Sequence, residues 1–226
     1  MFQSTFQNQP WCEGMLKQYK TILSHASAEI EEKKSRFIAN VKPVTCEEEA
    51  VEFINEIKSK YWDASHNVYA YYINGDNIIQ RFSDDGEPSG TAGLPVLEVI
   101  KRMDLQDLVV VITRYFGGTL LGAAGLVRAY GRSASSGVET AGIITKRLCV
   151  SISIIMGYPV FGKVQNQVIN YGYNIRNIEY TQDVEMVVLV PVDDVEMFIE
   201  FVNEVTNGEA LIEIGEKEYV SWQSDG

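Results

Sequence analysis

The chain has 226 residues, of which 46% are hydrophobic and 22% charged, which is ordinary for a globular protein and enough for two domains of modest size. Its net charge of −12 argues against a protein that coats nucleic acid by bulk electrostatics. Neither a membrane-spanning apolar run nor a secretory signal is recognisable, so we expect a cytoplasmic protein with no membrane partner. The three cysteines are widely spaced and there are only two histidines, which argues against a disulfide framework and a zinc site.

The first expected elements are a strand, a helix and a hairpin. Residues 35–44 alternate as in a strand. Residues 45–61 predict a helix that starts with a capping box of Thr45 and Glu48 and has a buried stripe of Val51, Phe53, Ile54 and Ile57. Residues 66–73 and 77–82 predict two strands joined by the turn Asn74-Gly75-Asp76, because Gly75 supplies the positive φ that a tight turn needs.

A polar loop, a helix, a buried strand and another helix follow the hairpin. The loop covers residues 82–93 (FSDDGEPSGTAG), and the helix runs from about 93 to 103 with Pro95 in its first turn. Residues 108–113 (LVVVIT) are continuously apolar, which indicates a strand covered on both faces. Residues 125–142 predict a helix that contains glycines.

The second half has a simpler pattern of strands and helices. Strands are expected at residues 144–154, 173–181, 184–191 and 209–220, and helices at residues 159–172 and 192–208. The order β-α-β-β-α-β is the ferredoxin-like arrangement, with two helices on one face of an antiparallel sheet. The second helix carries an acidic face, which we expect to be exposed: Asp193, Asp194, Glu196, Glu200 and Glu204.

The polar loop allows two interpretations. As a solvated turn, its Ser89 and Thr91 hydroxyls would cap the following helix while Asp84 pairs with Arg81 or Arg114. As a binding site, its carboxylates and hydroxyls would form one wall of a groove.

A second unusual segment covers residues 113–130 (TRYFGGTLLGAAGLVRAY). It lies between Asp107 and Glu139, an interval without acidic residues, and its glycines precede a helix start. An anion could therefore approach the backbone amides, and Arg114 and Arg128 could donate hydrogen bonds to it. The spacing matches neither a P-loop nor a dinucleotide fingerprint. The structural alternative is that the glycines allow tight packing of the helix on the sheet while the arginines are exposed or paired internally.

Four motifs together resemble the YigZ family, the bacterial relatives of the IMPACT proteins. They are KSRFIA, HNVYAYYI, RFSDDGEPSGTAGLP and VVVITRYFGGTLLGAAGLVRAY, and the resemblance covers residues 19–142. Ala124 departs from it, standing where the family usually has a second consecutive glycine. Val68 stands where relatives commonly carry a cysteine, which argues against a thiol mechanism there.

The resemblance implies a domain organisation and a fold. Residues 15–143 would form an α/β domain like the second domain of a small-subunit ribosomal protein. Residues 144–226 would form a ferredoxin-like domain resembling the last domain of elongation factor G, so the fold class is α+β / α/β. Family members usually begin just before the segment YKTI, so residues 1–14 are expected to be an extension before Met15.

For function, the resemblance implies a link to translation, and the leading hypothesis is a regulatory or translation-associated binding protein. We expect no cofactor and no metal. Its partner would be the ribosome, RNA or a translation-related protein. We expect a mixed-charge groove in the N-terminal domain, formed where the polar loop faces the glycine-arginine segment and lined by Lys34, Arg36, His66, Ser83, Asp84, Asp85, Glu87, Ser89, Thr91, Arg114, Tyr115, Gly117, Gly118 and Arg128.

The alternative is a magnesium-dependent enzyme acting on a phosphorylated or nucleotide substrate. Asp84 and Asp85 would hold the ion and His66 would serve as a general base. Adjacent carboxylates in an extended segment point to opposite sides, which makes a shared ion less favourable.

Overall fold

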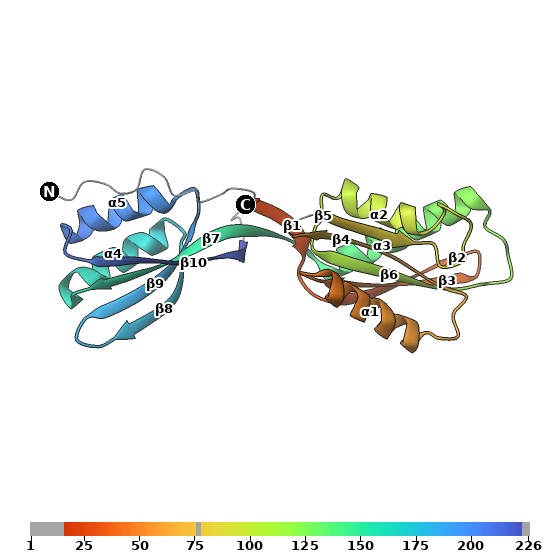
Figure 1. Ribbon diagram of the computed structural model, residues 1–226, viewed down its shortest axis with the longest axis horizontal. Helices are drawn as coiled ribbons and strands as arrows, with labels where there is room; N and C mark the ends of the chain where they lie inside the picture. Colours follow the sequence, from red (N-terminus) through yellow and green to blue (C-terminus); the bar gives the residue numbers. More distant parts are fainter. Residues whose placement is uncertain (1–15, 76–77, 223–226) are drawn as a thin grey trace. The chain divides into compact units, whose positions relative to one another are not determined.

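The computed structural model describes residues 16–75 and 78–222, which form two compact units (Figure 1). The N-terminal unit contains Tyr19–Thr145, and the C-terminal unit contains Lys146–Trp222 with residues 16–18. The expected extension, its boundary at Met15 and the Asp76 position of the hairpin turn lie outside the described residues. Within the described ranges, no helix is both long and apolar enough to span a bilayer.

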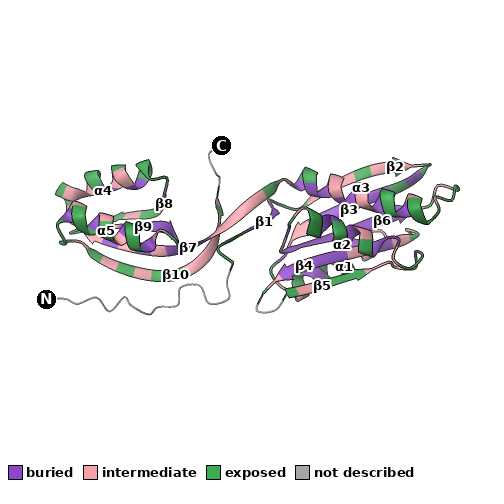
Figure 2. Ribbon diagram, turned by 90° about the horizontal axis from the view of Figure 1, so that it is seen from above, coloured by how far each residue is buried: buried purple, intermediate pink, exposed green. Residues whose placement is uncertain are grey.

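The N-terminal unit is built on a five-stranded antiparallel sheet. Its strands are β2 (Ala26–Glu32), β3 (Ser35–Pro43), β4 (His66–Asn74), β5 (Ile78–Ser83) and β6 (Leu108–Tyr115), in the order β2-β3-β6-β4-β5. Helices α2 (Gly93–Arg102) and α3 (Ala123–Ala141) cover one face, and α1 (Glu47–Lys60) covers the other (Figure 1). The central strands are the most buried, while β2 and β5 are partly exposed (Figure 2).

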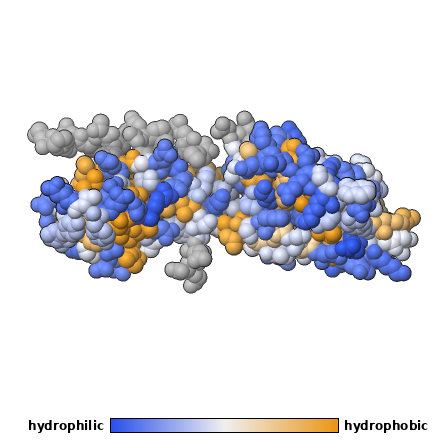
Figure 3. Space-filling view, turned by 90° about the horizontal axis from the view of Figure 1, so that it is seen from below, coloured by the Kyte–Doolittle hydropathy of each residue, from blue (hydrophilic) through white to orange (hydrophobic). Residues whose placement is uncertain are grey.

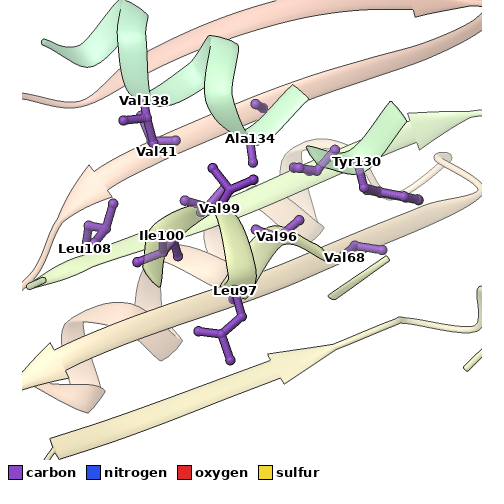
Figure 4. Close-up of a cluster of buried hydrophobic side chains, with 14 of the residues drawn as sticks. Val41, Val68, Val96, Leu97, Val99, Ile100, Leu108, Tyr130, Ala134 and Val138 are labelled. Atoms are coloured by element: carbon purple, nitrogen blue, oxygen red, sulfur yellow. The ribbon is translucent and has the colours of Figure 1, made fainter. Parts of the chain in front are cut away.

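Strand β6 lies between two hydrophobic cores, as its continuous apolar run predicted. Leu108, Val110 and Ile112 pack with α2 and α3, and Figure 4 shows the side chains of this core directed toward one another. Val109 and Val111 point to the opposite face and pack with α1. Because both faces of β6 are buried, alternation between polar and apolar residues is absent from its sequence.

Helix α1 forms where it was predicted, but two details of the prediction were wrong. The acid that reaches back to Thr45 is Glu49, whose Oε2 accepts from the Thr45 backbone nitrogen at 2.7 Å, and not Glu48. The buried stripe consists of Ala50, Phe53, Ile54 and Ile57, while Val51 is 44% exposed. A residue next to a buried position is rotated by about 100° around a helix, which turns Val51 toward solvent.

Two strands at the start of the chain were not predicted. They are β1 (Gln18–Ile22) and β2, and β2 is an edge strand whose residues are all partly or fully exposed. The sequence of β2, ASAEIEE, alternates between apolar and polar residues, but two of its three apolar residues are alanine, which is depleted in strands, so the signal is weak.

The C-terminal unit has the predicted order β-α-β-β-α-β. Its elements are β7 (Ile143–Met156), α4 (Tyr158–Asn170), β8 (Asn174–Tyr180), β9 (Val184–Pro191), α5 (Val195–Thr206) and β10 (Leu211–Trp222). The strands lie in the order β8-β9-β7-β10, with α4 and α5 on the same face (Figure 1). The core of this unit lies between the sheet and the two helices and includes Ile152, Val188 and Phe198.

The acidic side chains around α5 are exposed as expected, except that of Asp194, which is partly buried. Cys149 in β7 and Cys46 are free thiols, and burial raises the pKa of Cys149 to about 11. Cys12 is outside the described residues.

Two glycines of α3 predict opposite effects of the same substitution. A Cβ atom at Gly137 would lie 2.9 Å from Cβ of Ala39, whereas one at Gly131 would meet only Cγ2 of Val99 at 3.9 Å. Gly137→Ala should therefore lower the free energy of unfolding by about 1–3 kcal/mol through overpacking. Gly131→Ala should raise it by about 0.5–1 kcal/mol, because glycine is unfavourable inside a helix. Urea unfolding of both variants is the measurement, and equal signs would contradict this account.

Candidate functional site

A buried ion pair joins the polar loop to the end of β6. Nη1 of Arg114 lies 2.5 Å from Oε1 of Glu87, and the two side chains are only 6% and 4% exposed. The hydroxyl of Tyr130 on α3 donates to the same carboxylate oxygen at 2.8 Å. The polar loop and the glycine-arginine segment thus meet in direct contact, and the acid that pairs with Arg114 is Glu87, whereas the solvated-turn interpretation named Asp84.

The Arg114 guanidinium is surrounded by aromatic rings and a serine. Its central carbon lies 5.4 Å from the ring centre of Phe37 and 5.7 Å from that of Phe116, distances typical of cation–π contacts. Nη2 is 3.5 Å from the Ser35 hydroxyl, and Nε has no hydrogen-bond partner among the described residues. Most of the stabilisation of this buried charge therefore comes from Glu87.

His66 lies beside this pair and is oriented by the polar loop. Its Nδ1 is 2.8 Å from the backbone oxygen of Asp85, and a carbonyl can only accept, so Nδ1 carries the proton. Nε2 then faces Oε1 of Glu87 at 3.9 Å. His66 is the first residue of β4 and pairs in register with Arg114 of β6.

Asp84 caps the N-terminus of α2. Its Oδ1 accepts from the backbone nitrogens of Ala92 at 3.1 Å and Gly93 at 2.8 Å, and its Oδ2 accepts from Gly90 at 2.8 Å. A carboxylate at this position satisfies unpaired amides and interacts favourably with the helix dipole. The prediction that Ser89 and Thr91 cap this helix was wrong: Thr91 donates to the oxygen of Pro88, and Ser89 is exposed.

Asp85 has partners different from those of Asp84. Its Oδ1 lies 3.0 Å from Nζ of Lys58, and its Oδ2 accepts from the backbone nitrogen of Asn67 at 2.7 Å. The hydroxyl of Ser83 accepts from the Asp85 nitrogen at 3.2 Å, which fixes the start of the turn. The two neighbouring carboxylates are therefore each engaged separately. Within residues 16–75 and 78–222, no group of three or more His, Cys, Asp or Glu residues could hold a metal ion.

The glycines after β6 serve the local backbone. A Cβ atom at Gly117 would lie 2.1 Å from the carbonyl carbon of Lys34, so only glycine allows the β2–β3 turn to approach this closely. The Gly117 nitrogen donates to the Ser35 hydroxyl at 3.1 Å. Gly118 and Gly122 have φ of 80° and 71°, a region that favours glycine.

Of the remaining predicted site residues, Arg36 and Tyr115 pair across β3 and β6, with the guanidinium carbon 5.6 Å from the ring centre. Arg36 is exposed and binds Glu29 through two hydrogen bonds of 2.9 Å. The Tyr115 hydroxyl donates to Asp63 at 2.8 Å. Lys34 is exposed in the β2–β3 turn. Arg128 is exposed on α3 and lines a groove between α2 and α3, so it does not share a ligand position with the buried Arg114.

Sequence reasoning missed Tyr130, which binds the ion pair, and three exposed apolar residues of the N-terminal unit. Tyr130 was not singled out because an aromatic residue at helical spacing is usually a core residue. Trp62 and Leu120 are each 83% exposed and Phe116 is 49% exposed. The segments of Trp62 and Phe116 pack together, since the Phe116 nitrogen donates to Ser65 at 3.1 Å. Two exposed aromatic residues close to a glycine-rich turn are the signal that could have identified this surface.

We expect either half of the buried ion pair to be costly to remove alone. Glu87→Gln or Arg114→Met should each lower the free energy of unfolding by about 3–5 kcal/mol, because one buried charge loses its partner. The double variant should lose much less than the sum of the two. Urea unfolding of all three variants measures this coupling.

The exposed pair of Arg36 and Glu29 provides a matched control, because both side chains are about half exposed. Arg36→Gln should change stability little. Additive losses in the Glu87/Arg114 double variant would contradict the importance of the buried pair.

Tyr130 should make the protein sensitive to alkaline pH. Burial, with a further contribution from Glu87, raises the pKa of Tyr130 far above its ordinary value of 10.0. The unfolded chain ionises this tyrosine near pH 10 while the folded chain does not, so stability present below pH 10 is lost as the pH rises above it. One such group contributes up to about 1.4 kcal/mol per pH unit. In the Tyr130→Phe variant, the free energy of unfolding, measured with urea, should fall less steeply between pH 10 and 11 than in the wild type. An unchanged slope would be incompatible with this assignment.

Comparisons with known proteins match both units. Residues 33–138 match the family model of the Impact N-terminal domain, and residues 154–209 match a domain of unknown function (DUF1949). An IMPACT family member from Bacillus subtilis, YvyE, is 42% identical over 91% of this chain and 95% of its own length. YigZ of Escherichia coli is 41% identical over 44% of this chain and 50% of its own length.

One solved structure is similar in fold. The crystal structure of a hypothetical protein, 26% identical in sequence, superposes with a TM-score of 0.58 over 88% of this chain and 97% of that one. With the YvyE match spanning nearly the whole of both chains, these findings establish that the chain belongs to the IMPACT family.

Proposed function

We propose that this protein binds RNA, with ribosomal RNA as the first candidate, and acts in the cytoplasm as a translation-associated regulatory protein. The binding surface is an exposed patch of the N-terminal unit that we call the lysine–aromatic surface. It consists of Lys33, Lys34, Trp62, Phe116 and Leu120. The IMPACT resemblance supports the link to translation, and we include in this proposal the likeness of the two units to a ribosomal protein domain and to the last domain of elongation factor G.

The single observation that carries this proposal is the conformation of Lys33 and Lys34. They form the two-residue turn between β2 and β3, with φ of 48° and 67°. Such turns favour Asn-Gly or Gly-containing pairs, and a residue with a side chain in this region costs roughly 1–3 kcal/mol. Both lysines are exposed, and neither has a carboxylate partner within the described ranges. A strained turn that presents two free cations is best explained by a ligand that needs them.

The neighbouring side chains suit a nucleic acid. Gly117 packs directly on the backbone of Lys34, which brings Phe116 next to the lysine turn. Trp62 belongs to the segment that hydrogen-bonds to the end of β6 through Ser65. Exposed aromatic rings stack on unpaired bases, and ammonium groups pair with phosphates. Figure 3 shows apolar side chains at several places on one face of the N-terminal unit, among mostly hydrophilic ones.

The buried ion pair gives this surface a rigid base. Arg114 pairs with Glu87 inside the fold and contacts the Phe116 ring, so its charge orders the loops while the exposed lysines remain available. With a net charge of −12 over the whole chain, binding must be local and strongly dependent on salt.

Replacing the two lysines of the turn should raise stability and weaken RNA binding. The double variant Lys33→Asn, Lys34→Gly should be more stable than the wild type, since the turn strain is relieved. It should nevertheless bind a fluorescein-labelled RNA hairpin with a single-stranded loop more weakly. The slope of the logarithm of the association constant against the logarithm of the salt concentration should be smaller in magnitude by about 2. Fluorescence anisotropy and co-sedimentation with ribosomal subunits measure binding.

Trp62→Ala should also weaken binding by about tenfold, as expected for the loss of one stacked base. Lys163→Gln, on α4 of the C-terminal unit, is the control for a general loss of positive charge and should bind like the wild type. Wild-type affinity of the turn variant, or absence of salt-dependent binding to RNA and ribosomal particles, would refute the proposal.

A further inference from the structure

A groove of about 1050 Å³ runs between α2 and α3 of the N-terminal unit. Its apolar lining includes Leu94, Pro95 and Val127, and Leu94 and Val127 are 39% and 40% exposed. The length of α2 along it, from Leu94 to Arg102, corresponds to a rise of about 12 Å, or two helical turns. None of the residues of the lysine–aromatic surface lines this groove.

Gly131 lines the groove from α3, and packing of the fold does not require it. A Cβ atom there would meet only Val99, at 3.9 Å, and its backbone has no positive φ. Gly137, further along the same helix, is fixed by contact with Ala39 and Val41. Because a glycine inside a helix is unfavourable, Gly131 needs another explanation. A small residue at this position keeps the groove open.

The groove carries more positive than negative charge in a strongly acidic protein. Three arginines and two glutamates line it, which gives a net charge of +1 against −12 for the chain. Arg102 and Arg128 are exposed, and within the described residues neither has a carboxylate within ion-pair distance. Arg132 lies 3.2 Å from Glu32. Two guanidinium groups therefore stand free beside an apolar strip.

This combination favours a protein segment over a nucleic acid. Glu98 and Glu139 line the same groove, and a phosphodiester chain, which is charged at every nucleotide, would meet them, whereas a helix can place its few carboxylates beside the arginines alone. Leu94, Pro95 and Val127 offer apolar contacts that a phosphate backbone cannot use. An amphipathic helix can use both kinds of contact, because its apolar face enters a groove while carboxylates on its flanks pair with arginine.

We propose that the groove between α2 and α3 binds an acidic amphipathic helix of a partner protein. The helix contributes about two turns, with apolar residues against Leu94, Pro95 and Val127 and with carboxylates paired to Arg102 and Arg128. This inference is independent of RNA binding, since it concerns other residues and another class of ligand.

The test uses a fluorescein-labelled peptide with the sequence of residues 192–206, VDDVEMFIEFVNEVT, because this segment has the required acidic and apolar character. The full-length protein should bind it saturably in anisotropy measurements. A peptide with all five carboxylates changed to amides should bind at least tenfold more weakly, because the charged hydrogen bonds to arginine are lost.

Two protein variants locate the binding site. The double variant Arg102→Gln, Arg128→Gln should weaken peptide binding at least tenfold. Gly131→Leu should do the same by filling the groove, and circular dichroism should show an intact fold because a Cβ atom at this position meets only Cγ2 of Val99, at 3.9 Å. Arg81→Gln removes an exposed arginine that does not line the groove and should leave the affinity unchanged.

Several outcomes would overturn the proposal. They are the absence of saturable binding, equal affinity of the acidic and amide peptides, and wild-type affinity of both groove variants. Loss of RNA affinity in the groove variants without any peptide binding would identify the groove as a phosphate site and would equally refute it.

Discussion

The Arg114–Glu87 ion pair is the interaction on which the arrangement of the N-terminal unit depends. Removing both charges from water costs several kcal/mol per ion, which mutual attraction offsets only with good geometry and additional hydrogen bonds. Here the distance is 2.5 Å, Tyr130 adds a hydrogen bond, and the rings of Phe37 and Phe116 flank the guanidinium. The pair joins a loop, a strand and a helix that are distant in sequence.

This pairing also decides which charges are available to ligands. Glu87 neutralises Arg114, Asp84 caps α2, and Asp85 binds Lys58, so the carboxylates that make the loop sequence conspicuous act within the fold. The exposed cations that we consider, which have no ion-pair partner among the described residues, lie outside this loop: Lys33 and Lys34 in the β2–β3 turn, Arg102 on α2 and Arg128 on α3. An acidic protein can therefore present two positive surfaces of different character, one beside aromatic rings and one beside aliphatic side chains.

The sequence predicts most elements of the fold but not the partners within the site. Continuous burial of β6 and the β-α-β-β-α-β order have periodic signals that depend on local spacing. Strand β2 has only a weak signal of this kind, because two of its three apolar residues are alanines. Which of Asp84, Asp85 and Glu87 would turn inward toward Arg114 depends on the backbone path of the turn, including φ of 46° at Asp85, and single-residue propensities do not determine that path.

Glycine shows why the physical cause at each position matters more than the residue type. Gly117 permits a close approach of two backbones, Gly118 and Gly122 supply positive φ, and Gly137 permits contact between α3 and β3. All four are explained by the folded chain alone. Gly131 has none of these causes, and the lysine turn likewise carries strain that asparagine and glycine would relieve. At Gly131 and at the lysine turn, stability is given up without a reason in the folded chain, which is why we relate these two positions to ligands.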